Sequence, residues 1–94
     1  MLINSDARRL KIPPAVKASR DPDGIVLIHT TIGRLFSSNK TGARIWHYLE
    51  QQMSVDAMAS EISREYGIAE TAGREHVLTF LAELQRHGLI ECGS

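Results

Sequence analysis

The sequence has little of several features, and each shortage excludes a class of protein. It contains one cysteine among 94 residues, so no internal disulfide can form and a reducing cytoplasm is the expected compartment. No apolar run approaches the ~18 residues of a membrane span, and residues 1–9 lack the apolar stretch of a secretory signal. Lys/Arg and Asp/Glu number 11 each, so the chain lacks the general basic character of nucleic-acid-binding proteins. We therefore expect a cytoplasmic protein with neither a membrane nor a nucleic acid as partner.

Length and composition fit a single small globular domain. Of the residues, 43% are apolar and 23% charged, as in an ordinary soluble protein, and a chain of this length can build one modest core. Residues 1–12 show no clear periodicity and are predicted to form a flexible segment. The domain is expected to cover residues 13–91 and to leave residues 92–94 as a tail.

The charges are unevenly distributed although their sum is zero. Residues 1–47 hold eight Lys/Arg and three Asp/Glu, which gives +5, whereas residues 48–94 hold three and eight, which gives −5. This polarity can orient a charged partner, and it is also compatible with two simply solvated faces.

The first half of the chain carries the pattern of three strands. Pro13-Pro14 forbids helix and introduces a short strand from Ala15 to Arg20. The turn Asp21-Pro22-Asp23-Gly24 leads into the β-branched, apolar run Ile25–Thr30. Thr31-Ile32-Gly33 fits a three-residue hairpin loop, and the third strand, Arg34–Ser38, is short and ends in serines, as is typical of a sheet edge.

The second half carries the pattern of three helices. Asn39 or Thr41 can cap the first, Ser54 caps the second, and the third begins near Glu70 or Thr71 and runs to about His87. The predicted fold class is therefore α+β, with a three-stranded antiparallel N-terminal sheet followed by three helices in a winged-helix-like order.

Residues that could carry out chemistry are scattered. The four histidines form no metal-ligand spacing with Cys92 or with a carboxylate, and Cys92 has no base beside it. No glycine-rich turn enters a helix, so a phosphate loop is absent. The sequence predicts no catalytic residue, no metal and no cofactor, and hence a protein that is not an enzyme.

An ordered set of motifs carries a family resemblance. Gly24–Ile28, then Gly33-Arg34, then Asn39–Trp46, and finally Val77–Leu84 closed by Gly88-Leu89-Ile90 together resemble the PqqD-like family, the RiPP recognition elements of peptide natural-product biosynthesis. Pro13-Pro14 and Thr41-Gly42-Ala43 resemble most the stand-alone members from lasso-peptide pathways. The resemblance covers roughly residues 13–91.

The resemblance implies a peptide-binding function. Such proteins bind the leader segment of a ribosomally made precursor and present it to a leader peptidase or another modifying enzyme. The leader is held as an added strand on the third strand, beside the third helix. Ser38 stands where the family usually has leucine, which makes this edge more polar.

Physical reasoning supports the same location. An unpaired edge strand offers backbone hydrogen bonds to an added strand, and the apolar arc of the third helix is wider than a core alone requires. Such a broad arc can also bury itself entirely against the sheet and another helix. The predicted peptide-binding residues are Arg34, Leu35, Phe36, Ser37, Ser38, Lys40, Arg74, Val77, Leu78, Leu81 and Gln85.

Two alternatives remain at this stage. One is a winged-helix DNA-binding domain, but the second and third helices carry more acidic than basic residues, whereas a DNA-reading helix usually bears several Lys or Arg. The other is a structural subunit docked to an enzyme without peptide affinity of its own. A gel shift tests the first alternative, and titration with short peptides tests the second.

Overall fold

The computed structural model describes residues 9–93, and the remainder of the predicted N-terminal segment, residues 1–8, lies outside the described part together with Ser94. The elements follow the order β1 (Arg9–Lys11), β2 (Val16–Asp21), β3 (Gly24–His29), β4 (Arg34–Asn39), α1 (Lys40–Glu50), α2 (Val55–Tyr66), α3 (Glu70–Arg86) and β5 (Glu91–Gly93). The predicted α+β class, a three-stranded antiparallel sheet followed by three helices, is confirmed. None of the helices described is both long and apolar enough to cross a membrane.

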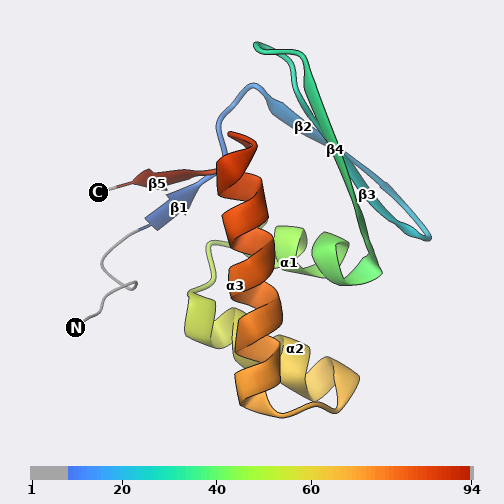
Figure 1. Ribbon diagram of the computed structural model, residues 1–94, viewed down its shortest axis with the longest axis vertical. Coiled ribbons are helices and arrows are strands. Elements are labelled where there is room, and N and C mark those ends of the chain that lie inside the picture. The colour runs from blue at the N-terminus through green and yellow to red at the C-terminus, as the bar shows by residue number, and fades with distance from the viewer. Residues whose placement is uncertain (1–8, 94) are drawn as a thin grey trace.

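The central sheet has the order β2-β3-β4, so β4 is one of its two edges (Figure 1). The hairpin between β3 and β4 pairs His29 with Arg34, and its loop holds four residues instead of the predicted three. Gly33 closes the loop in the left-handed region, at φ 67°, where glycine has no steric penalty. Its N–H donates to the carbonyl of His29 at 2.8 Å, a bond across five residues that the extra loop residue makes possible.

Capping side chains determine where the first two helices begin. The Asn39 side chain accepts the N–H of Gly42 at 3.0 Å and starts α1 directly after β4, without a connecting loop. Ser54 accepts the N–H of Ala57 at 3.1 Å and starts α2. These bonds satisfy N–H groups that have no partner inside the helix.

The core lies between the inner face of the sheet and the helices. Figure 1 shows α3 running past the sheet, with α1 crossing at its middle and α2 packed beside its N-terminal half. Each helix gives one apolar stripe to the core, and β3 contributes Ile25 and Leu27. Trp46, the single tryptophan, is 1% exposed and acts as a core anchor, with its Nε1–H donating to Glu50 at 3.2 Å. The buried side chains of the three helices include Ile45, Trp46, Leu49, Met58, Ile62, Val77, Phe80, Leu81 and Leu84.

A second, two-stranded sheet joins the described ends of the chain. β1 pairs antiparallel with β5, and the pair lies on the other side of α3 from the central sheet (Figure 1). Leu10 and Ile12 pack against the core as partly buried side chains. Residues 9–11, which the sequence alone predicts to be flexible, thus form a strand. No local sequence pattern predicts this strand, because its partner, residues 91–93, lies at the other end of the sequence.

Candidate functional site

The outer edge of β4 exposes backbone groups that can be assigned residue by residue. The His29 carbonyl accepts from Gly33 within the hairpin, so the backbone polar groups of His29 point towards β4. The next residue, Thr30, donates its N–H to Ala15 at 2.9 Å on the β2 side, as the alternation of a strand requires. Continuing this alternation along the register directs the N–H groups of Phe36 and Ser38 towards β3. The N–H groups of Leu35 and Ser37 therefore point to the open edge.

The side chains of β4 alternate between two faces. Phe36 is opposite Leu27 and Ser38 is opposite Ile25, so both lie on the face that packs against the helices. Leu35 projects from the outer face and is 63% exposed. The residues whose N–H groups point to the open edge are thus those whose side chains contribute least to the core.

A groove of about 490 Å³ lies between β4, the beginning of α1 and α3. Its β4 wall contains Phe36 and Ser38, and its floor is formed by the start of α1 and by Phe80 from α3. The complete lining is Phe36, Ser38, Asn39, Thr41, Gly42, Ile45, Glu75, His76, Thr79, Phe80 and Glu83. The groove runs beside the open edge that a fourth strand would use.

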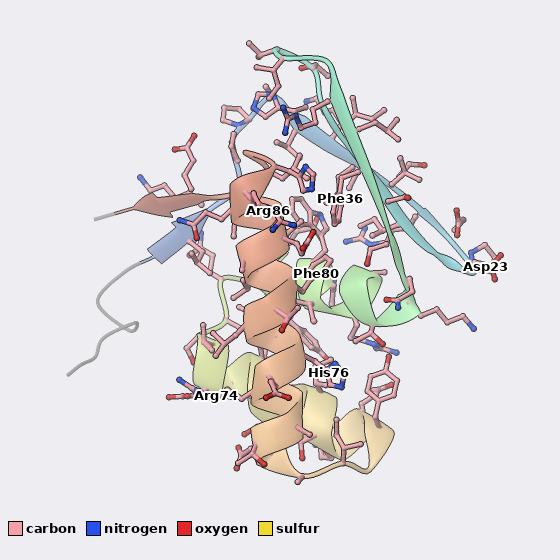
Figure 2. All side chains as sticks on the ribbon, in the orientation of Figure 1. Asp23, Phe36, Arg74, His76, Phe80 and Arg86 are labelled. Carbon is pink, nitrogen blue, oxygen red and sulfur yellow. The ribbon has the colours of Figure 1, made fainter. Side chains whose placement is uncertain are left out.

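Close packing of α1 against its neighbours shapes the groove. A Cβ at position 42 would lie 2.2 Å from the Ser38 hydroxyl and 2.8 Å from a ring carbon of Phe80, which is closer than side-chain atoms approach. Gly42 therefore lets the start of α1 fit between β4 and α3. The rings of Phe36 and Phe80 pack against one another at the groove, with centroids 6.2 Å apart and an interplanar angle of 55° (Figure 2).

The charged side chains of the lining come from α3 alone. Glu75 and Glu83 are its two carboxylates, and none of the eleven lining residues is Lys or Arg. Glu83 forms an ion pair with Arg86, and its second oxygen lies 3.8 Å from the Nε2 of His87. Among the described side chains, Glu75 forms no ion pair, so its charge is the uncompensated one at the groove.

The residues predicted on β4 lie together along this site. Phe36 and Ser38 line the groove, while Leu35 and Ser37 occupy the alternate positions at the open edge. Lys40 is the first residue of α1 and is exposed, but it lies outside the groove lining, as does Arg34 at the start of β4.

The residues predicted on α3 lie outside the groove lining. Val77 and Leu81 are buried in the core, whereas Leu78 is 46% exposed and Gln85 is exposed. Arg74 forms an ion pair with Asp56 of α2, and Figure 2 shows it on the other side of α3 from His76. The face of α3 that lines the groove is formed by Glu75, His76, Thr79, Phe80 and Glu83. Sequence reasoning missed these residues because all but Phe80 are polar, and a polar helix face resembles a solvated one.

The described residues hold no gathering of three or more His, Cys, Asp or Glu side chains that could bind a metal ion. His76 lines the groove, but His87 contacts the Phe36 ring with centroids 5.1 Å apart. The arrangement offers backbone hydrogen bonds, two aromatic rings and two carboxylates. These groups suit the binding of an extended peptide.

Comparisons with known proteins agree with this arrangement. The sequence pattern of the family described as "Coenzyme PQQ synthesis protein D (PqqD)" matches residues 24–90. The solved structure of TbiB1 in complex with the TbiA(β) leader peptide is 30% identical, with a TM-score of 0.80 over 86% of this chain and 94% of that one. Lasso peptide synthetase B1 complexed with the leader peptide is 20% identical and shares the fold, with a TM-score of 0.80 over 88% of this chain and 98% of that one. A search of curated proteins gave no match.

Proposed function

Since the chain belongs to the PqqD family, as a RiPP recognition element, we propose that it binds the leader segment of a ribosomally synthesised precursor peptide. The recognition domains of this kind are non-catalytic, so the chain is not an enzyme. The related protein TbiB1 forms a complex with the TbiA(β) leader peptide. A leader peptide as the partner of this chain would fit the groove and the open edge of β4.

The proposed mode of binding is addition of the leader as a strand to β4. The observation that carries it is the pair of outward N–H groups, at Leu35 and Ser37, beside a groove of about 490 Å³. Backbone bonds to these groups supply affinity that is independent of sequence, while the groove selects the side chains that face it. Arg34 and Lys40, which border the strand, are proposed to attract carboxylates of the leader outside the groove.

The proposed pathway is that of a lasso-peptide precursor. This assignment rests on Pro13-Pro14 and Thr41-Gly42-Ala43, which resemble the stand-alone proteins of such pathways. The chain would hold the leader while a separate leader peptidase, or another modifying enzyme, acts on the rest of the precursor. A small precursor gene, a cysteine-type peptidase gene and a cyclase gene beside this one would support the pathway.

Amide NMR spectra test the binding mode directly. The ¹⁵N-labelled chain is titrated with the leader segment of the precursor encoded beside its gene. The amides of Leu35 and Ser37 should shift most within β4, since they gain hydrogen bonds, and Thr79 and Phe80 should shift as the groove fills. Shifts confined to other surfaces, or none at saturating peptide, would remove the basis of the proposal.

DNA binding is not favoured by the groove. The exposed groove face of α3 carries Glu75 and Glu83, which oppose the phosphate backbone that supplies much of DNA affinity. A gel shift with the full chain should therefore show no complex at the protein concentrations that saturate the leader.

A further inference from the structure

The charge of the groove restricts which leaders can occupy it. A strand added to β4 would place every second side chain on the same face as Phe36 and Ser38, and these side chains would enter the groove. There they would meet Glu75 and Glu83; no residue of the lining is Lys or Arg, and only Glu83 has a cationic partner, Arg86, outside the lining. A carboxylate on this face would be both desolvated and repelled, whereas a cation would be attracted.

We propose that the chain selects leaders with an arginine or lysine on the face turned towards α3, and that Glu75 is the residue that determines this preference. The inference rests on the proposed function, since it concerns the same groove. Glu75 is assigned the role because Glu83 is already paired with Arg86, so its charge is partly compensated. An arginine suits the site well, since its planar guanidinium can form two parallel hydrogen bonds with the Glu75 carboxylate.

The spacing of the acidic residues fits an extended peptide. Glu75, Thr79 and Glu83 recur every four residues along α3, and a helical rise of 1.5 Å per residue separates the first from the last by about 12 Å. Three successive groove-facing side chains of a strand span roughly 13 Å, since they are two residues apart. If a groove-facing cation of the leader lies near Glu75, its next groove-facing side chain therefore lies near Phe36, Phe80 and Thr79, which are mostly apolar.

The test uses a yeast-displayed library of random 12-residue peptides, sorted for binding to the full chain. Peptides are counted as groove ligands only when Ser37→Pro abolishes or weakens their binding and Ser37→Ala does not, because proline removes the outward N–H. The same library is sorted against Glu75→Lys. The matched control is Asp23→Lys, which makes the same change of charge in the exposed turn between β2 and β3, outside the groove lining (Figure 2).

Groove ligands of the unchanged chain and of Asp23→Lys should carry Arg or Lys at alternate positions, and those of Glu75→Lys should carry Asp or Glu there instead. Replacing that cation by glutamate in one selected peptide should weaken binding about three- to tenfold, and Glu75→Lys should restore it. Groove ligands without this alternation, or with a preference that Glu75→Lys leaves unchanged, would overturn the inference and leave the proposed function standing. If no selected peptide depends on the Ser37 N–H, the proposed binding mode at β4 fails together with the inference.

Discussion

Individual cations near the groove differ in what they are free to do. Arg34 and Lys40 border β4, are exposed and belong to no ion pair among the described residues. Arg74, which the sequence places with them, is instead held by Asp56 on the far side of α3. The sequence alone predicts the same peptide-binding role for all three. It does not show which face of α3 packs inward, and therefore it does not show where the Arg74 side chain points.

We predict that these three cations contribute differently to leader affinity. Arg34→Ala together with Lys40→Ala should weaken leader binding by about 0.2–1 kcal/mol per residue, since exposed pairs contribute little each. The loss should be smaller at high salt, which screens such pairs. Arg74→Ala is the matched comparison and should leave leader affinity unchanged. Fluorescence anisotropy at low and high salt measures all three effects, and an Arg74→Ala loss equal to that of the other two would contradict the assignment.

Among the elements, β4 and α1 were predictable and the groove face of α3 was not. The serines and the shortness of β4 mark it as an edge, and the capping residues Asn39 and Ser54 lie at the positions expected from the sequence. The apolar arc of α3 correctly indicates core residues such as Val77 and Leu84. It does not indicate a groove, because the groove wall is polar and is defined only by the three-dimensional position of β4 and α1. The hairpin register is likewise set by the four-residue loop, which is one residue longer than the sequence predicts, and by its Gly33 bond.

The prediction that the leader adds to β4 as a strand depends on that register. Leu35→Pro and Ser37→Pro remove N–H groups that point to the open edge, so the free energy of unfolding should change little. Leader affinity should fall by about 0.5–1.5 kcal/mol, the contribution of one hydrogen bond, with an added cost for the unpaired leader carbonyl. Phe36→Pro and Ser38→Pro remove bonds to β3 and should destabilise the fold. Urea denaturation and peptide titration measure both quantities, with Leu35→Ala and Ser37→Ala as controls that keep the N–H. The reverse pattern of stability would show the assigned alternation to be wrong.

At the scale of the whole molecule, binding and stability are linked. A leader that binds only the folded state stabilises it by RT ln(1 + [L]/Kd), which is about 2.7 kcal/mol at a hundredfold excess over Kd. For a domain of this size, 1 kcal/mol corresponds to roughly 4–8 °C, so the melting temperature should rise by roughly 10–20 °C. A leader added as a fourth strand at β4 would contact both the sheet and α3, and these two layers must separate when the chain unfolds.

The last prediction combines the rise in melting temperature with the absence of any chemical change in the bound leader. Scanning calorimetry of the full chain with its leader should show the rise in melting temperature, and Ser37→Pro should reduce it by the amount that its weaker affinity requires. Mass spectrometry of the recovered peptide should show an unchanged mass, because a non-catalytic recognition element releases its ligand as it was bound. A leader that is cleaved by the pure protein, with cleavage lost on changing Cys92 or a histidine, would contradict this account. A leader that stays intact but leaves the melting temperature unchanged at saturation would show that the complex does not depend on the folded edge and groove.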